Sequence, residues 1–477
     1  MCGLEQQNSS DFGGYEKKNG KVDMKDMPLP AYLSKDYLIP LLFFQSYLIE
    51  REENGLLGAS FLHQQISYKC QNFTNKPDLR SIINAISDRH LLLRSLIVQN
   101  DGAYFFKIDM SPDLYNVINI NAEDAGGDEQ EIRRRLCQVA SRPFDLRSEP
   151  PVRAVCIQLS QNEYIVNLIV HHAVSDGRSQ EIISRDLHDL LLNAGSWSSC
   201  NAESGIAFSE YVRETLSELG SKRDLEARKF WTQKLKDRTS QSVLDIQNAP
   251  IKKGEADFLQ EHFESGRDVI EKLRGLSKRG FTMNLLFLAA NVFALREITK
   301  SNYLVIQCVS SGRLDNRINN MVGCMIEMVP LAVDTSDVIT YLDLISTVRK
   351  SYVDCLANIP VAFSSFLSEI NFSDGNTPVL NWIEIPSSEP ASNENGPDGI
   401  SVEKYVPDRA VDSCDFRGDQ GHYIAAFDSG DAFRGTVNRP DWWDPKTTPM
   451  LIEKIDFFFR NVVENPGGAI SPVPEPQ

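Results

Sequence analysis

The chain has 477 residues, more than the roughly 250–300 residues at which a single hydrophobic core stops growing, so we expect at least two cores. Apolar residues make up 42% of the chain, an ordinary globular value that excludes a wholly disordered or fibrous molecule. The 66 acidic residues outnumber the 49 basic ones, and the resulting formal charge of −17 argues against nucleic acid as a partner.

The first elements along the chain are a helix and a hairpin. Residues 76–88 place apolar side chains at helical spacing behind an aspartate that can cap the first turn. Two strand-like runs follow at residues 93–98 and 104–108. The Asp101-Gly102 pair between them is a strong hairpin signal, because both positions of a type I′ turn need positive φ.

A second hairpin and a helix come next. Residues 151–159 and 164–170 are rich in β-branched side chains, and the polar residues 162–163 between them favour a turn. Residues 178–193 then carry their apolar side chains on one helical face. The local order is therefore strand, loop and helix.

The second half of the chain again mixes helices and strands. Helices are predicted at residues 208–235, 269–276, 283–298 and 449–463, and a strand is predicted at residues 303–309. Thr282 is the expected N-cap of the strongly apolar third helix. Residues 387–399 are rich in Ser, Pro, Asn and Gly and predict a long mobile loop.

These elements predict an α/β protein with mixed sheets and two lobes of similar size. The expected division is a flexible tail at residues 1–35, a first lobe at 36–200, a second lobe at 201–466 and a flexible tail at 467–477.

Cysteine usage and hydropathy indicate the compartment. The nine cysteines stand singly, which suggests neither a disulfide framework nor a zinc site. Residues 1–35 lack the apolar segment of a signal peptide. The longest apolar runs, such as residues 38–44, fall well below the ~18 residues that a membrane span needs. We therefore expect a cytoplasmic protein with no metal and no membrane contact.

The most informative segment is residues 171–177, with the sequence HHAVSDG, between a β-rich run and a helix. Successive side chains on a strand point to opposite faces, so one histidine can face a cleft while its neighbour packs inside. Asp176 can cap the following helix, and Gly177 lets the chain approach a ligand closely. The positive end of that helix lies near the place where an oxyanion would form.

A histidine in this segment suits general-base catalysis. Its ordinary pKa near 6.5 leaves it mostly neutral at cellular pH and able to accept a proton from a nucleophile. The alternative is a satisfied core histidine followed by an ordinary Asp-Gly turn. The whole seven-residue pattern, placed between strand and helix, favours the catalytic interpretation.

The pattern His-His-x-x-x-Asp-Gly resembles the signature of the condensation domains of nonribosomal peptide synthetases. These domains share a fold with chloramphenicol acetyltransferase and many acyl-CoA-dependent alcohol acyltransferases. Other blocks that resemble the family stand in the same order at residues 89–95 (RHLLLRS), 143–146 (PFDL), 151–154 (PVRA), 230–235 (FW and L), 282–294, 311–313 (SGR) and 321–331 (MVGC and PL). Together the blocks extend over roughly residues 37–465.

The resemblance implies two chloramphenicol-acetyltransferase-like lobes in a V, with a central tunnel and His172 near its middle. An acyl-donor thioester and an acceptor would enter the tunnel from opposite faces, and His172 would deprotonate or orient the acceptor. The resemblance also implies that Asp176 is structural and held by a salt bridge to Arg153. Gly177 would supply room or a backbone amide near the oxyanion, and His171 would support the loop.

Four further residues are candidates for the substrate tunnel: Ser175, Arg178, Ser310 and Glu327. Glu327 stands where peptide-forming relatives usually carry Asn, which affects the acceptor half of the tunnel. Arg178 stands where an aromatic residue is common.

The sequence contains no adenylation, carrier-protein or thioesterase motif, so we expect a free-standing enzyme without a bound cofactor of its own. Its acyl group would come from the phosphopantetheine of a carrier protein or from CoA.

Three functions remain open at this point. The first is a condensation enzyme of natural-product biosynthesis that joins an acyl or aminoacyl group from an acyl or peptidyl carrier protein to an amine or alcohol, forming an amide or ester. The second is a CoA-dependent O-acyltransferase of secondary metabolism. The third is a non-catalytic recruitment domain. We expect the chain to be a monomer.

Overall fold

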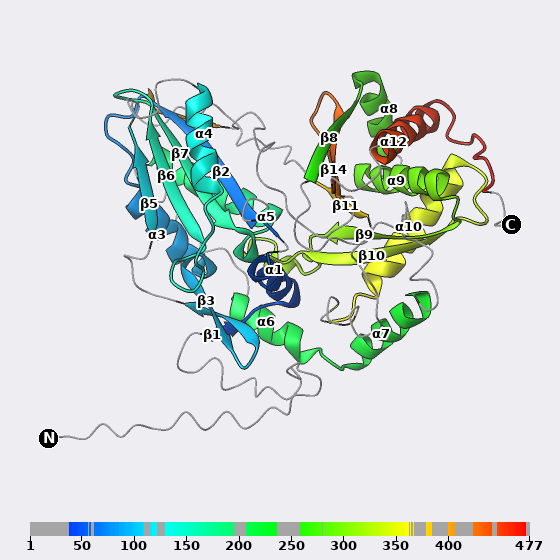
Figure 1. The fold of residues 1–477 in the computed structure, drawn as a ribbon, viewed down its shortest axis with the longest axis horizontal. Helices are drawn as coiled ribbons and strands as arrows, with labels where there is room; N and C mark the ends of the chain where they lie inside the picture. Colours follow the sequence, from blue (N-terminus) through cyan, green and yellow to red (C-terminus); the bar gives the residue numbers. More distant parts are fainter. Residues whose placement is uncertain are drawn as a thin grey trace.

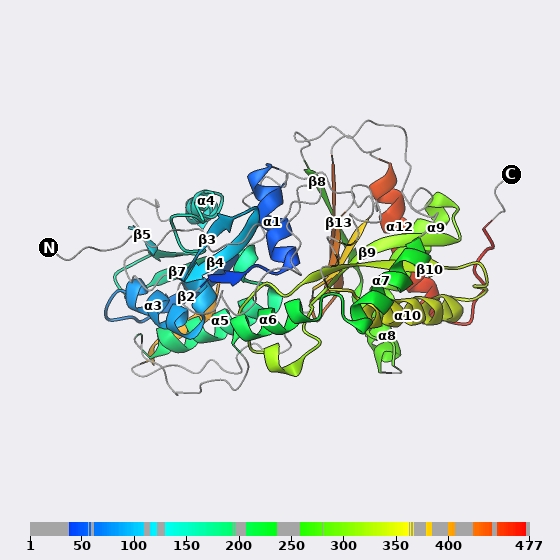
Figure 2. The same cartoon turned by 90° about the horizontal axis from the view of Figure 1, so that it is seen from below.

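The computed structural model shows two lobes that lie side by side, each with its own hydrophobic core (Figures 1 and 2). The predicted tail at residues 1–35 and residues 387–398 of the predicted loop lie outside the described residues. The structure describes residues 38–55, 57–58, 62–108, 115–121, 129–193, 195, 207–235, 258–278, 280–361, 363, 366, 378–383, 399–405, 423–440 and 446–473.

The first lobe is built on two sheets. Its strands are β1 Leu38–Pro40, β2 His63–Gln71, β3 Ser95–Asn100, β4 Ala103–Ile108, β5 Asn116–Ile120, β6 Val152–Gln158, β7 Tyr164–His171 and β12 Ser401–Lys404. The larger sheet has the order β12-β2-β7-β6-β5, in which only β5 and β6 run parallel, and the smaller one has the order β1-β4-β3. Every residue of β7 is buried, so the strand that leads to the His-His motif is fixed in the centre of the lobe.

The helices of the first lobe cover these sheets. They are α1 Phe43–Glu53, α3 Leu79–Arg89, α4 Glu129–Ala140, α5 Gly177–Leu192 and α6 Phe208–Ser217, with the short 3-10 helices η3 Leu91–Arg94 and η5 His172–Val174. The predicted cap of α3 is confirmed, because the Asp78 carboxylate accepts hydrogen bonds from the amides of Arg80 and Ser81. Helices α3 and α5 contact each other and the larger sheet.

Both predicted hairpins are confirmed. Strands β3 and β4 pair antiparallel, and the turn between them has φ of 48° at Asp101 and 83° at Gly102. These positive values are those of the type I′ turn, whose twist matches the twist of the strands it joins. Strands β6 and β7 form the second antiparallel pair.

The second lobe contains a six-stranded sheet in the order β10-β9-β11-β13-β14-β8. Its strands are β8 Phe258–Ser265, β9 Tyr303–Ser310, β10 Glu327–Asp334, β11 Val379–Trp382, β13 Tyr423–Asp428 and β14 Phe433–Pro440. Strand β11 runs parallel to both of its neighbours, and the other pairs are antiparallel. The prediction of an α/β fold with mixed sheets is therefore confirmed.

The helices of the second lobe pack around one apolar helix. They are α7 Lys222–Leu235, α8 Arg267–Ser277, α9 Met283–Thr299, α10 Tyr341–Ala357 and α12 Thr447–Glu464. The 3-10 helix η6 Asn316–Ile318 follows β9, and its buried Ile318 side chain belongs to the first core. Helix α9 contacts α8, α10 and α12, which explains why it is apolar on nearly every face. Its predicted cap is confirmed, because Thr282 Oγ1 accepts a hydrogen bond from the Leu285 amide at 3.2 Å. None of the helices that the structure describes is long and apolar enough to span a membrane.

The segment predicted as one helix at residues 208–235 is two helices. The break contains Gly220, whose φ is 71° and whose amide donates to the Asp224 carboxylate. Val212 of α6 belongs to the first core, and Trp231 of α7 belongs to the second. Strand β12 likewise returns to the first sheet from late in the chain. The polypeptide therefore crosses between the two cores more than once, and the first core includes residues beyond 200.

Residues 467–473, expected to form part of a flexible tail, pack against the second lobe instead. The Ile470 amide donates to the Ile339 carbonyl at 2.7 Å, and Ala469 forms an isolated bridge with Thr340. The buried Arg296 guanidinium donates to the Ser471 carbonyl at 3.0 Å. The segment is held because it satisfies this buried cation and places the Ile470 side chain in the core.

Candidate active site

The His-His motif lies at the exit of strand β7, where the chain turns through η5 into α5. His171 ends the buried strand and has no exposed surface, whereas His172 is partly exposed. This arrangement agrees with the predicted alternation of the two side chains. Helix α1 holds the turn from the other side, since the buried Gln45 side chain donates to the Ala173 carbonyl at 3.0 Å.

His171 has its tautomer fixed by its partners. Its Nδ1 accepts a hydrogen bond from the Ala173 amide at 3.1 Å, so the Nε2 atom is the ring nitrogen that carries a proton. The Nε2–H group donates to Glu52 Oε2 at 3.0 Å. Burial by itself would raise the pKa of Glu52, but the hydrogen bond and the charge interaction with His171 outweigh it, and the pKa is lowered. His171 is thus a structural support for the turn.

A second histidine, His63, lies behind His171. The two ring centroids are 5.7 Å apart, and the Phe144 ring makes edge contacts with both rings. His63 Nδ1 donates to the Ala140 carbonyl. Burial, followed by the neighbouring His171, lowers the pKa of His63 to about 4, so this ring stays neutral.

Glu52, His63 and His171 bring one possible ligand atom each to within 4.8 Å of one another, a spacing that suggests a metal site. The tautomer of His171 argues against that use. Its Nδ1 lone pair is taken by a backbone amide, so its Nε2 carries a proton and cannot coordinate a cation as a neutral ligand. The trio is better explained as the hydrogen-bonded support of the motif.

The predicted salt bridge between Arg153 and Asp176 is wrong. Arg153 is fully buried, and its guanidinium lies 3.7 Å above the Phe144 ring centroid. It donates to Glu149 at 2.7 Å and to the carbonyl oxygens of Arg142 and Pro143. The side chain is directed at the segment before β6, away from the head of α5. Arg153 supports the motif through Phe144, whose ring contacts that of His171.

Asp176 is held by Arg313, which follows β9 of the second sheet. Arg313 Nη2 lies 2.9 Å from both carboxylate oxygens, and both side chains are almost completely buried. The carboxylate also accepts from the amide and hydroxyl of Ser179, at 2.8 and 2.7 Å, and from the Met325 amide at 3.1 Å. Asp176 therefore caps α5 as predicted and also ties α5 to the chain between β9 and β10.

The turn that presents Arg313 depends on a glycine. Gly312 has φ of 65°, and a Cβ added there would lie 1.7 Å from the Met325 carbonyl oxygen. No side chain can be accommodated at this position without moving the backbone. The Gly-Arg pair is thus the sequence signal for the true partner of Asp176.

His172 has its Nδ1 atom beside a cysteine. This nitrogen lies 3.7 Å from the Sγ atom of the buried Cys324. Burial is the main cause that lowers the pKa of His172, while hydrogen bonds to the backbone of His172 and Ser175 and the charge of Asp176 act in the opposite direction. The imidazole is therefore neutral at neutral pH and able to accept a proton.

The thiol beside His172 is not activated. Burial, and then the charge of Asp176, raise the pKa of Cys324 well above its ordinary value. Cys324 packs instead with apolar side chains of α1, including Phe44 and Leu48. We assign it the role of holding the His172 ring.

The other predicted residues at the head of α5 differ in their surroundings. Gly177 is exposed, and a Cβ there would meet no protein atom within 4 Å. Arg178 is also exposed and donates to the Asn319 carbonyl at 3.0 Å and the Asn320 side chain at 3.2 Å, which makes a second contact with the segment after β9. Ser175 is completely buried. Their roles along a substrate tunnel stay predictions.

Glu327 and Ser310 are brought together by the second sheet. They are register partners at the end of the β9–β10 pair. Ser310 is buried, and its Oγ accepts from the Gly312 amide at 3.4 Å. Glu327 is partly exposed, but its Oε2 atom is buried and has no hydrogen-bond partner among the described residues. Burial raises the pKa of Glu327 to about 7.

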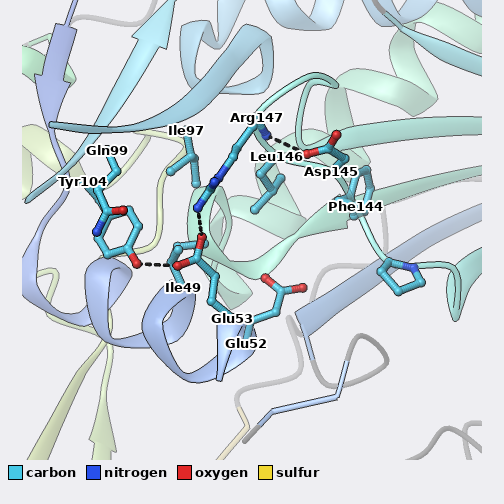
Figure 3. Close-up of a pocket in the computed structure, with 11 residues that line it drawn as sticks. Ile49, Glu52, Glu53, Ile97, Gln99, Tyr104, Phe144, Asp145, Leu146 and Arg147 are labelled. Carbon is cyan, nitrogen blue, oxygen red and sulfur yellow. Dashed lines mark hydrogen bonds and ion pairs between the residues drawn. The ribbon is translucent and has the colours of Figure 1, made fainter. Parts of the chain in front are cut away.

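A pocket of about 230 Å³ lies beside α1, between that helix, the β3–β4 hairpin and the segment before β6 (Figure 3). Glu53 closes its polar side by accepting hydrogen bonds from Tyr104 at 2.6 Å and Arg147 at 2.8 Å. Glu52 lines the same pocket and reaches His171 behind it. The pocket therefore borders the support of the motif, while His172 does not line it.

Sequence reasoning missed three residues of the site: Glu52, Arg313 as a partner, and Cys324. Arg313 stood in the block at residues 311–313 that resembles the family, but the block did not indicate that Arg313 pairs with Asp176. Glu52 follows an apolar run without any motif. Cys324 stood in the block at residues 321–331 that resembles the family, but nothing in that block indicated a contact with His172. Only the fold brings these side chains to the motif.

Comparisons with known proteins agree with this geometry. A family model described as "Condensation domain" matches residues 39–381. A linear gramicidin synthase polypeptide of Brevibacillus parabrevis is 27% identical over 74% of this chain, and the beauvericin nonribosomal cyclodepsipeptide synthetase of Gibberella fujikuroi is 23% identical over 88%. The chain spans only 7% and 13% of the length of these two relatives.

Solved structures share the fold. The SgcC5 protein of Streptomyces globisporus superposes with a TM-score of 0.72 at 18% identity, over 90% of this chain and all of that one. The condensation domain of the monacolin K polyketide synthase MokA gives a TM-score of 0.70 at 14% identity, over 91% of this chain and 99% of that one. With the family model matching well over half of its length, the chain belongs to the condensation domain family.

Proposed function

We propose that this chain is an acyltransferase that moves an acyl or aminoacyl group from a phosphopantetheine thioester to an amine or hydroxyl acceptor, forming an amide or an ester. The observation that carries the proposal is His172, a neutral and partly exposed imidazole at the head of α5. It is framed by the Glu52–His171 hydrogen bond on one side and the Asp176–Arg313 ion pair on the other.

The chemistry follows from the neutral ring of His172. Its Nδ1 faces Cys324, so we assign to Nε2 the proton that the acceptor loses as it attacks the thioester carbonyl. A C–N or C–O bond forms, the C–S bond breaks, and the imidazolium returns the proton to the leaving thiolate. The first amides of α5, beginning at Gly177, would stabilise the oxyanion in the open space where that residue has no side chain.

The relatives support this class of reaction. Condensation domains form amides or esters and work with carrier-bound substrates in nonribosomal peptide synthetases. Two of the relatives of this chain are the linear gramicidin synthase and the cyclodepsipeptide synthetase named above. We therefore propose a carrier-bound phosphopantetheine arm as donor rather than free CoA.

The test is acyl transfer followed by intact-mass spectrometry. The purified chain is mixed with a carrier protein charged with a series of acyl groups and with a set of amines and alcohols. We expect transfer to require the carrier and His172→Ala to lower the rate by about 10²–10⁴-fold. Equal rates from free acyl-CoA would overturn the carrier donor.

A non-catalytic role makes a different prediction in the same assay. The chain also superposes on the X-domain from teicoplanin biosynthesis with a TM-score of 0.71 at 17% identity, which shows a shared fold. If the His172→Ala variant turns over as fast as wild type, the proposed chemistry is contradicted. It is also contradicted if wild type transfers no acyl group at all.

A further inference from the structure

The cavity beside α1 lies apart from the chemistry proposed for His172. Its volume is about 230 Å³, below the roughly 300–1,000 Å³ of sites for drug-sized molecules, so it suits a ligand of few atoms. The described residues that line it include none of the His-His motif. Its apolar lining comes from α1, β3 and the segment before β6: Ile49, Ile97, Pro143, Phe144 and Leu146.

The polar lining of the cavity is mainly acidic. Its charged residues are Glu52, Glu53, Asp145 and Arg147. Arg147 and Tyr104 both donate to Glu53, at 2.8 and 2.6 Å (Figure 3). Asp145 accepts hydrogen bonds from the Ser148 hydroxyl and the Arg147 amide. The Arg147 guanidinium is therefore taken by Glu53, and Asp145 has partners of its own.

Glu52 has one oxygen in use and one without a partner. Its Oε2 accepts from His171 Nε2 at 3.0 Å, while its Oε1 makes no hydrogen bond to any described residue. Figure 3 shows the Glu52 carboxylate apart from the hydrogen bonds that bind Glu53. The Glu52 side chain is 18% exposed and lines the cavity, so a ligand there can reach this carboxylate.

The two histidines behind Glu52 do not supply a compensating charge. His171 keeps the lone pair of Nδ1, because that atom accepts from the Ala173 amide. Burial, followed by the neighbouring His171, lowers the pKa of His63 to about 4, so this ring stays neutral. The carboxylate of Glu52 is therefore mostly buried without a cation, an arrangement that a positive ligand would relieve.

The buried guanidinium of Arg153 is also already paired. It packs on the Phe144 ring, with 3.7 Å between the guanidinium carbon and the ring centroid. Its Nη2 atom donates to Glu149 at 2.7 Å, and both Nη atoms donate to backbone carbonyls. Its charge is therefore balanced by Glu149, and the cavity keeps its negative character.

We propose that this cavity binds a small alkylammonium ligand, whose ammonium group donates to Glu52 Oε1 and whose carbon skeleton packs against Ile49, Ile97 and Leu146. The ligand is held and not acylated, because His172 does not line the cavity. The proposed site is independent of the acyl transfer described above and goes beyond it.

Other classes of ligand fit the cavity less well. An anion would be repelled by the carboxylates that line it. A hard metal ion such as Ca²⁺ takes about six or more oxygen ligands, whereas Glu52 offers a single oxygen beside apolar walls. A neutral ligand would leave Glu52 without a charge partner. An ammonium group on an apolar skeleton matches both the charge and the walls.

The experiment measures binding by titration calorimetry at pH 7 with no acyl donor present. The probe is 3-methylbutylamine, and 3-methylbutan-1-ol is its neutral counterpart on the same skeleton. We expect the amine to bind wild type with a dissociation constant on the order of 1 mM and the alcohol to bind at least about tenfold more weakly.

Two pairs of variants locate the site. Glu52→Gln keeps an oxygen that can accept from His171 but removes the charge, and Glu214→Gln removes the charge of an exposed carboxylate on α6. Gln99→Trp enlarges an exposed residue that lines the cavity, and Asn100→Trp enlarges its neighbour on the opposite face of β3. We expect Glu52→Gln and Gln99→Trp each to weaken amine binding at least about tenfold, and both controls to bind as wild type does.

Hydrogen exchange followed by mass spectrometry places the probe on the chain. We expect the amine to slow exchange in peptides of residues 47–55 and 143–149, which carry most of the lining, and to leave peptides of α12 unchanged. Protection confined to other segments would overturn the proposed site.

The remaining outcomes also decide the matter. The site is wrong if wild type does not bind the amine at about tenfold the expected dissociation constant, or binds the alcohol equally well. It is also wrong if His172→Ala abolishes amine binding while Gln99→Trp keeps it, since the amine would then lie beside His172. Retained binding in His172→Ala together with loss in Gln99→Trp and Glu52→Gln supports it.

Discussion

Asp176 and Arg313 stand 137 residues apart in the chain and form a two-oxygen ion pair that joins the head of α5 to the segment after β9. The same carboxylate caps α5 through the Ser179 amide. The position of His172 therefore depends on residues of both lobes. A rigid connection of this kind would hold the His172 ring, the proposed general base, in place.

Removal of the cation from this pair should be strongly destabilising. Arg313→Met leaves Asp176 buried without its charge partner, and we expect a loss of about 3–5 kcal/mol in the free energy of unfolding, measured by urea denaturation. Arg317→Met removes an exposed arginine four positions later, whose ion pair with Glu214 is screened by solvent, and should change the free energy of unfolding far less. Similar losses for the two variants would contradict the role given to the buried pair.

Stability should depend on pH through His63. Its pKa is about 4 in the folded chain and 6.5 in the unfolded one, so between these values the unfolded state binds the extra proton. The contribution of His63 is fully present above pH 6.5 and is lost as the pH falls toward 4. His63→Gln should reduce the slope of unfolding free energy against pH in this window by about 1.4 kcal/mol per pH unit.

The matched control for this measurement is His262→Gln, which changes an exposed histidine on β8. Glu52 acts at lower pH, since its pKa is held below 4.5. A His63→Gln slope identical to that of wild type between pH 4 and 6.5 would show that the ring is not kept neutral by its surroundings.

Two glycines near the site should respond in opposite ways to alanine. Gly312→Ala places a Cβ against the Met325 carbonyl in a left-handed backbone, and we expect a loss of at least about 2 kcal/mol in unfolding free energy. Gly177→Ala meets no protein atom, so its stability should match wild type while acyl transfer slows. Urea denaturation and the acyl-transfer assay measure the two effects. A fully active Gly177→Ala variant would show that the reaction does not need the space left by the missing side chain at residue 177.

Cys324 should not act as a nucleophile. Its thiol is buried and its pKa is raised, so we expect Cys324→Ala to retain acyl transfer within about tenfold of wild type, far above His172→Ala. Intact-mass spectrometry of wild type during turnover should detect no acylated protein. An acyl adduct that Cys324→Ala abolishes would instead establish a covalent intermediate.

The sequence by itself determined the features that depend on a few neighbouring residues. The Asp101-Gly102 turn, the Asp78 and Thr282 caps, and the strand, turn and helix around the His-His motif are each set by local backbone preferences and hydrogen bonds. The order of the motif blocks also sufficed to identify the family that the comparisons then showed.

The tertiary structure alone decided which side chains meet. From the sequence alone, Arg153 and Arg313 are equally plausible partners for Asp176, because any arginine can pair with any carboxylate. Strand β6 aims Arg153 at the preceding segment, while the Gly312 turn places Arg313 at the head of α5. The contacts of Glu52 and Cys324 with the two histidines are decided in the same way, by the packing of elements that the chain brings together from far apart.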